Sequence, residues 1–172
     1  SRALGDVYKR QVIAAQNARS TTSVDLANRS RGLTEENFGL NGIDPKSQYI
    51  YVMDTFDYYN YAARHGLQYE TVVIDPPSFA RNKKKTFSVQ KDYGSLVKGA
   101  LSVLAPEGSL LLCTNSSAFS LKAFKNVIKK TLDEEGVEFE IREVMGLPKD
   151  FKTHPHYKPS KYLKAVFIDI KH

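Results

Sequence analysis

Residues 69–79 read Tyr-Glu-Thr-Val-Val-Ile-Asp-Pro-Pro-Ser-Phe, and this stretch indicates how the chain folds. Tyr69–Ile74 is rich in β-branched and aromatic residues and is apolar from Val72 onward, which is typical of a strand buried within a sheet. The run ends abruptly at Asp75, and two prolines follow. Because proline cannot donate to a strand ladder, we expect the strand to stop there and a stiff loop to begin.

Short apolar runs and helical periods alternate on both sides of this strand, without an internal repeat or a low-complexity tract. We expect further strands over residues 21–24, 49–53, 109–113, 137–141 and 162–170. We expect helices over residues 28–40, 56–64, 89–106 and 120–136. Strands that alternate with helices in this way predict a doubly wound α/β fold, in which helices wrap a parallel sheet.

The composition is that of one globular domain. The chain has 172 residues, of which 41% are hydrophobic and 26% charged, so it can bury a core without disulfides. Cys113 is the only cysteine, which indicates a reducing compartment. No apolar run approaches the roughly 18 residues of a membrane span, and the N-terminus has no signal-peptide stretch. We therefore expect a cytoplasmic protein with no membrane partner.

Positive charge is concentrated in two segments of this chain, whose formal net charge is +6. Residues 81–98 hold five lysines and one arginine against a single acid, and residues 149–172 hold six lysines against two acids. A basic balance favours a polyanionic partner such as nucleic acid.

Three successive strands end in a carboxylate, at Asp25, Asp54 and Asp75. Aspartate is common in turns after strands, but ligands of doubly wound sheets bind beyond the carboxyl ends of the strands. An acid after the second strand of such a sheet can accept hydrogen bonds from both ribose hydroxyls. An acid one strand further out can accept the amino group of an adenine. The pattern predicts an adenosine site, open to NAD or to S-adenosylmethionine.

The loop from Asp75 to Phe79 distinguishes between these ligands. Two prolines fix φ and leave a stiff loop of hydrogen-bond acceptors at the sheet edge. Such a loop can receive the amino or imino hydrogens of a planar base, while Phe79 stacks on its face. A nicotinamide-binding oxidoreductase needs no such feature, so we favour S-adenosylmethionine and a nucleobase substrate. The alternative is an ordinary proline-stiffened turn.

Several separated motifs agree in order with one family. Residues 75–80 and 87–93 resemble class I S-adenosylmethionine-dependent methyltransferases that act on large-subunit ribosomal RNA, particularly the group with an N-terminal PUA domain. Further segments that resemble the family are 23–26, 35–42, 53–56, 154–155 and 162–164. The resemblance covers about residues 12–172. It implies a Rossmann-like sheet, mostly parallel, with an antiparallel C-terminal strand.

The resemblance also implies roles for particular residues. Asp25 and Leu26 would bind the cofactor S-adenosylmethionine, with Asp25 on its ribose, and Asp54 and Thr55 would bind its adenine. The target base, in 23S ribosomal RNA, would be held by residues 75–79, with Asp75, Pro76 and Phe79 as catalytic residues.

Residues 1–11, SRALGDVYKRQ, depart from the family pattern. The family sheet begins with a strand and a glycine-containing loop, and this stretch has neither; it resembles a translated sequencing-adapter artefact. We therefore expect residues 12–172 to be a fragment of the methyltransferase domain, without the first strand and the PUA domain. An alternative to an active enzyme is then an inactive fragment that retains at most RNA binding.

The atom that is methylated depends on Cys113 and Asn115. Family members that methylate cytosine C5 use a cysteine that attacks C6, and an alignment on Gly108 places Asn115 at that position. Related domains that methylate guanine N7 carry asparagine in this region. Because Cys113 lies two residues back toward the core, we favour guanine N7 over cytosine C5, with Asn115 as a catalytic residue on the base edge.

The remaining expectations concern RNA and metal. Five basic side chains near the base-binding loop or the C-terminal motif are expected to contact RNA: Arg81, Lys83, Lys84, Lys85 and Lys164. His154 and His156, with one distant cysteine, form a poor set of metal ligands, so we expect no metal.

Overall fold

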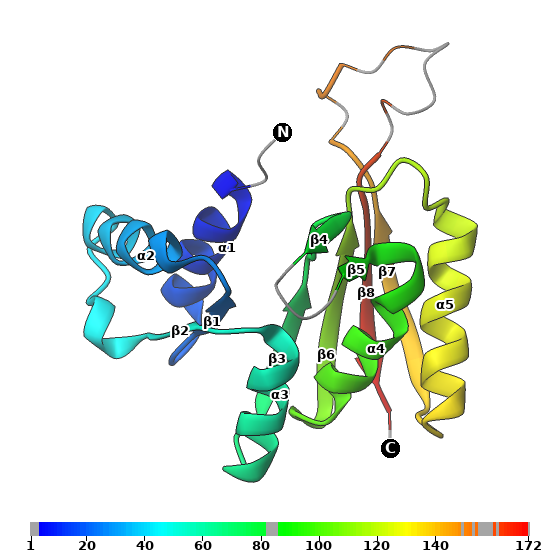
Figure 1. Cartoon of the computed structure of the whole chain (residues 1–172), viewed down its shortest axis with the longest axis horizontal. Helices are drawn as coiled ribbons and strands as arrows, with labels where there is room; N and C mark the ends of the chain where they lie inside the picture. Colours follow the sequence, from blue (N-terminus) through cyan, green and yellow to red (C-terminus); the bar gives the residue numbers. More distant parts are fainter. Residues whose placement is uncertain are drawn as a thin grey trace. The chain divides into compact units, whose positions relative to one another are not determined.

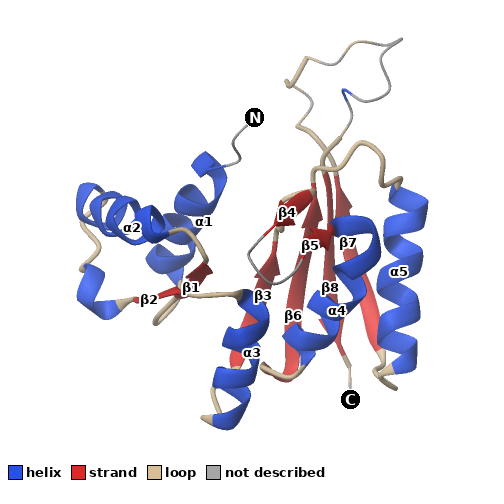
Figure 2. Ribbon diagram, viewed as in Figure 1, coloured by secondary structure: helices blue, strands red, loops and turns tan. Residues whose placement is uncertain are grey.

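The computed structural model describes residues 4–81, 86–148, 150–152, 154, 160 and 162–171. The chain divides into two compact units, residues 1–61 and residues 62–172. Figure 1 labels the elements of both units, and Figure 2 distinguishes their helices from their strands.

The first unit combines a small parallel sheet with helices. Its elements are α1 (Leu4–Asn17), β1 (Thr22–Asp25), α2 (Asn28–Leu40), the 3₁₀ helix η1 (Pro45–Ser47), β2 (Tyr49–Val52) and the first part of α3 (Thr55–Arg64). β1 and β2 pair in parallel, from Thr22 opposite Tyr49 to Asp25 opposite Val52. The carboxyl ends of the two strands therefore meet at one edge.

The core of the first unit lies against α2. Ser30, Thr34 and Phe38 recur at every fourth position and form its buried face, with Phe38 fully buried. A separate aromatic cluster joins β2 to α3, because the ring of Tyr51 lies 5.0 Å from that of Tyr58 and 5.7 Å from that of Tyr61.

The second unit contains a four-stranded sheet in the order β3-β6-β8-β7. Its main elements are β3 (Tyr69–Ile74), α4 (Val89–Leu101), β6 (Leu104–Thr114), α5 (Leu121–Glu134), β7 (Phe139–Met145) and β8 (Lys164–Ile170). β3 and β6 are parallel, and β8 is antiparallel to both of its neighbours. The expected mixed sheet, mostly parallel with an antiparallel C-terminal strand, is therefore confirmed.

The core of the second unit lies on one face of this sheet. Leu110 is opposite Ile168 and Leu112 is opposite Val166, and all four side chains are fully buried. Helices α4 and α5 cover this face (Figure 1). Each of these aliphatic side chains contributes about 1.5–3 kcal/mol by its burial.

A short hairpin that the sequence does not predict follows β3. β4 (Phe79–Arg81) pairs antiparallel with β5 (Thr86–Ser88), so that Phe79 is opposite Ser88. Three-residue strands are too short for alternation to reveal them.

The predicted helix over residues 89–106 is too long. Helix α4 ends at Leu101, and β6 already begins at Leu104. β6 contains a tight turn, because Glu107 has a φ of +56° and a Cβ on Gly108 would lie 2.8 Å from the Ala105 carbonyl oxygen. Pairing with β3 shifts register across this turn, so the apolar residues at its start belong to the sheet.

Strand β3 is less buried than its sequence indicates. Ile74 is buried, but Val73 is 49% exposed. Among the described residues β3 pairs with β6 alone and β1 with β2 alone, so each strand has one unpaired edge. An edge strand lacks one neighbour, which explains the exposure. That a first strand is missing between them stays a prediction.

Helix α1 is a second element that the sequence does not predict. It begins inside the stretch 1–11 and continues to Asn17, past the expected boundary at residue 12. The domain boundary itself stays a prediction.

Candidate active site

The first unit brings two of the predicted carboxylates to one edge. Asp25 ends β1, and Asp54 follows β2 directly before α3. The backbone of Met53 donates to the Asp25 carbonyl oxygen at 3.1 Å, which continues the pairing beyond the strands. Asp25 and Asp54 are both half-buried.

The Asp25 carboxylate is oriented by the start of α2. Its Oδ1 accepts the Ala27 N–H at 2.8 Å, and its Oδ2 accepts the Ser30 hydroxyl at 2.7 Å. An ionised carboxylate has about four acceptor positions, so each oxygen can accept one further hydrogen bond. The neighbouring Leu26 is 55% exposed and offers an apolar surface beside these oxygens. This set can hold a ribose.

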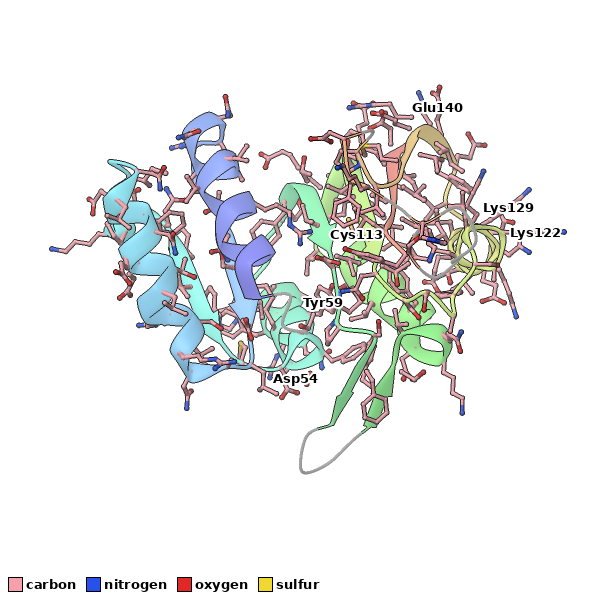
Figure 3. The ribbon with its side chains drawn as sticks, turned by 90° about the horizontal axis from the view of Figure 1, so that it is seen from above. Asp54, Tyr59, Cys113, Lys122, Lys129 and Glu140 are labelled. Carbon is pink, nitrogen blue, oxygen red and sulfur yellow. The ribbon has the colours of Figure 1, made fainter. Side chains whose placement is uncertain are left out.

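Asp54 forms the start of α3. Its Oδ1 accepts the Phe56 N–H at 2.9 Å, and its backbone oxygen accepts the Tyr58 N–H at 2.9 Å. Thr55 is the first residue of the helix and is half-buried. Figure 3 labels Asp54. A carboxylate has about four acceptor positions, so one such side chain can both cap a helix and accept an adenine amino group. These residues therefore fit the adenosine part of S-adenosylmethionine.

The second unit joins the proline loop to Asn115. β3 and β6 are parallel with Ile74 opposite Leu112, so residues 75–78 and Asn115 leave the sheet at the same edge. The Ser78 hydroxyl donates to Asn115 Oδ1 at 2.9 Å. Phe79, at the end of the loop, is 62% exposed and therefore accessible to a stacking base.

Tyr93 connects the two strands immediately before these residues. Its hydroxyl donates to the Cys113 carbonyl oxygen at 2.9 Å and lies 3.4 Å from the Ile74 carbonyl oxygen. The side chain is fully buried on α4. The sequence predicts that Tyr93 lies in a helix and in a family motif, but it does not reveal this role. The signal was a tyrosine on an apolar helix face, where its hydroxyl needs a partner.

Cys113 is a buried free thiol, 5% exposed, and it lies on β6 opposite Ala165 (Figure 3). Asn115 is half-buried and follows the end of the strand. The two residues that decide the chemistry thus differ in accessibility.

Lys164 does not lie on an open surface. It is 8% exposed, and its ammonium group donates to the carbonyl oxygens of Ser116 at 2.6 Å and Tyr162 at 2.8 Å. Desolvation by this burial lowers the pKa of Lys164. The geometry argues against the phosphate contact that we expected. Lys164 instead fixes the turn that follows Asn115.

The other basic residues of the predicted RNA site are described in part or not at all. Of Arg81 the structure describes the backbone, in β4. Lys83, Lys84 and Lys85 lie outside the described residues, so their RNA contacts stay predictions. His156 also lies outside them, and His154 is exposed.

The described part of the chain holds neither a metal-ligand cluster nor a membrane-spanning helix. Among these residues no three His, Cys, Asp or Glu side chains are grouped so that they could hold a metal ion. No helix within the same residues is long and apolar enough to cross a membrane.

The sequence profile of the S-adenosylmethionine-dependent methyltransferases matches residues 7–168 of this chain. The chain belongs to this family. S-adenosylmethionine is the cofactor of the family, so the cofactor inferred from the sequence is confirmed. The match begins inside the stretch 1–11.

Individual relatives of this methyltransferase chain agree with the family assignment. YwbD of Bacillus subtilis, named as a ribosomal RNA large subunit methyltransferase, is 44% identical over 154 residues, which are 90% of this chain and 39% of YwbD. Ribosomal RNA large subunit methyltransferase K of Neisseria meningitidis is 34% identical over 131 residues, 71% of this chain and 37% of that protein.

Among solved structures, one described as a methyltransferase complexed with SAH superposes with a TM-score of 0.88 at 39% identity, covering 96% of this chain and 43% of that one. This agreement confirms the methyltransferase fold. The chain spans about two-fifths of the length of these relatives. The PUA domain stays a prediction.

Proposed function

We propose that the protein transfers a methyl group from S-adenosylmethionine to a base of large-subunit ribosomal RNA. The observation that carries this proposal is the hydrogen bond between Ser78 and Asn115, which joins the proline loop and an amide at one sheet edge. The names of the relatives support ribosomal RNA as the substrate.

Each of the predicted residues has a task in this proposal. Asp25 and Asp54 hold the adenosine part of the cofactor, and Leu26 and Thr55 lie beside them. When bound, S-adenosylmethionine supplies an electrophilic methyl carbon, and transfer to a base nitrogen leaves the electron pair of the broken C–S bond on sulfur.

The target base is held in the second unit. The Asp75 carboxylate and the Pro76 carbonyl accept the amino or imino hydrogens of the base, Phe79 stacks on its face, and Asn115 contacts its edge. Positioning of this kind can supply most of the rate enhancement when the nucleophile needs no activation.

Guanine N7 is the atom that we favour. Methylation at cytosine C5 needs a thiolate that attacks C6, whereas N7 already has a free lone pair. Cys113 is buried, which supports this choice. Its Cα also lies about 6.6 Å from that of Asn115 in an extended chain, so the thiol and the amide cannot occupy the same position against the base. A buried thiol in an apolar setting is also a poor nucleophile.

The test is methyl transfer by the full-length protein with Cys113→Ala, with large-subunit ribosomal RNA as substrate. We expect kcat to stay within about threefold of wild type, since free buried cysteines pack as small apolar groups. The product should map to a guanine that is sensitive to borohydride and aniline. Asn115→Ala is the matched variant and should lose most activity. Loss of activity in Cys113→Ala, with a covalent adduct of wild type on 5-fluorocytosine RNA, would assign the reaction to cytosine C5.

A further inference from the structure

Helix α5 carries its charges against its own dipole. It has no acid in its first turn and no base in its last turn. Lys122 and Lys125 lie near its N-terminus, while Asp133 and Glu134 lie at its C-terminus. A helix dipole favours the opposite arrangement, so stability alone does not explain the positions of these lysines.

Two acids at the C-terminal end have partners that compensate them. Lys98 Nζ lies 2.7 Å from Glu135, and this hydrogen bond raises the pKa of Lys98. Lys130 Nζ lies 3.7 Å from Glu134. In contrast, within the described part of the chain no carboxylate lies within 4.0 Å of the ammonium groups of Lys122 or Lys125. The two N-terminal lysines therefore remain uncompensated.

The same two lysines lie at the end of the second unit's sheet from which Asn115 emerges. α5 follows β6 through residues 115–120, and its N-terminal end lies at the end of the sheet where β3 and β6 finish (Figure 1). Hydrogen bonds from Lys164 to Ser116 and from Gln90 to Ala118 hold the connecting turn in place.

The side chains are accessible from outside. Phe124, Ile128 and Leu132 form the buried face of α5, whereas Lys122 is exposed and Lys125 half-buried. Figure 3 shows Lys122 on the outer side of the helix, turned away from the sheet. Side chains three apart on a helix are neighbours, so Lys122 and Lys125 form one small cationic surface.

We infer that Lys122 and Lys125 bind backbone phosphates of the RNA next to the target base. This inference rests on the proposed function, because the groups proposed to hold the base lie at the same edge. Phosphate contacts position a nucleic acid without reading its sequence. They also explain why cations are kept at the positive end of a helix dipole.

The experiment compares two double variants of the full-length protein that remove equal charge. Lys122→Gln with Lys125→Gln tests the proposed surface, and Arg19→Gln with Lys46→Gln, at two exposed cations outside α5, is the control. Filter binding to deproteinised large-subunit ribosomal RNA at several KCl concentrations gives affinity and salt slope. For the first pair we expect about tenfold weaker binding and a slope reduced by about 1 to 2, as two lost phosphate contacts imply.

Thermal unfolding adds a second readout. Removing Lys122 and Lys125 should leave the melting temperature unchanged or raise it, because the dipole opposes these cations. Equal losses of affinity in both pairs, or an unchanged salt slope in the first pair, would overturn the inference. So would a lowered melting temperature that accounts for the weaker binding.

The methyl-transfer assay separates this inference from the proposed function. If the first double variant shows the expected loss of affinity and salt slope but wild type transfers no methyl group, the proposed function is contradicted and the RNA-binding surface stands. A wild-type protein that transfers the methyl group, with RNA binding unchanged in the first double variant, would contradict the inference alone.

Discussion

The Ser78 hydroxyl donates to the side-chain oxygen of Asn115 at 2.9 Å, across the edge where β3 and β6 end. This bond leaves the amide nitrogen of Asn115 to face a ligand, and among the described residues that nitrogen has no acceptor. Ser78 therefore makes Asn115 a hydrogen-bond donor. On guanine, O6 is an acceptor next to N7, which suits such a donor.

Replacing Ser78 by alanine should release the Asn115 amide. We expect kcat for methyl transfer to fall about tenfold, the effect of one lost orienting hydrogen bond, with KM for S-adenosylmethionine unchanged. Asn115→Asp should lose more, because an acceptor then replaces the donor. Steady-state kinetics on ribosomal RNA measures both.

The control for this prediction is Ser95→Ala on the exposed face of α4, which should match wild type. If Ser78 acts through Asn115, adding Ser78→Ala to Asn115→Ala should change nothing further. Additive losses in the double variant would contradict the orienting role.

Removing the Tyr93 hydroxyl should destabilise the second unit. Tyr93→Phe leaves the Cys113 and Ile74 carbonyl oxygens without this donor, so we expect the free energy of unfolding to fall by about 1–2 kcal/mol. Urea unfolding measures the change. Tyr49→Phe, on a residue that is 56% exposed, is the matched control and should have no effect. Equal stabilities of Tyr93→Phe and wild type would show that the hydroxyl contributes nothing.

Local signals explain why much of the fold could be predicted. Helix α5 begins where Ser120 accepts the Ala123 N–H and is followed by Gly136 with a φ of +68°, both readable from the sequence. The strands before Asp25 and Asp75 end at turn-forming residues that sequence reasoning recognises. The first two carboxylates meet at one edge because β1 and β2 are parallel, which alternation with helices implies.

Other features depend on contacts between distant residues. The β4–β5 hairpin has no pattern of its own, and the start of β6 reads as helix because its residues continue the spacing of α4. Lys164 reads as a surface cation, since a lysine is buried only where acceptors from elsewhere meet it. Here those acceptors are carbonyl oxygens of Ser116 and Tyr162, 48 and two residues away.

The lysines at positions 83–85 should contact RNA phosphates, as the sequence indicates from their place after the base-binding loop. Replacing all three by alanine in the full-length protein should weaken binding to ribosomal RNA and lower its salt slope by about 2 to 3. Filter binding across KCl concentrations measures this. Unchanged affinity together with an unchanged slope would show that these lysines are solvated and make no contact.

The buried ammonium group of Lys164 should give stability a distinct dependence on alkaline pH. Desolvation lowers its pKa in the folded protein below the ordinary value of 10.5. Between the folded and the ordinary pKa, the unfolded chain binds more protons than the folded one at this residue. Stability from this group therefore rises with pH in that window and is constant below it.

We expect the stability difference, wild type minus Lys164→Met, to increase as pH rises toward 10.5 and to be flat near neutrality. Urea unfolding at a series of pH values measures this difference. The hydrogen bond to Glu135 raises the pKa of Lys98, and the hydrogen bond to Glu140 raises the pKa of Lys171. Both shifts make stability fall at alkaline pH, opposite to the effect of Lys164. They cancel in the difference between the two proteins, because both proteins contain them. Lys129→Met, on an exposed face of α5, controls for the loss of one charge. A difference for Lys164→Met that falls with pH, or one that follows the Lys129→Met control, would mean that burial does not disfavour the charged form of Lys164.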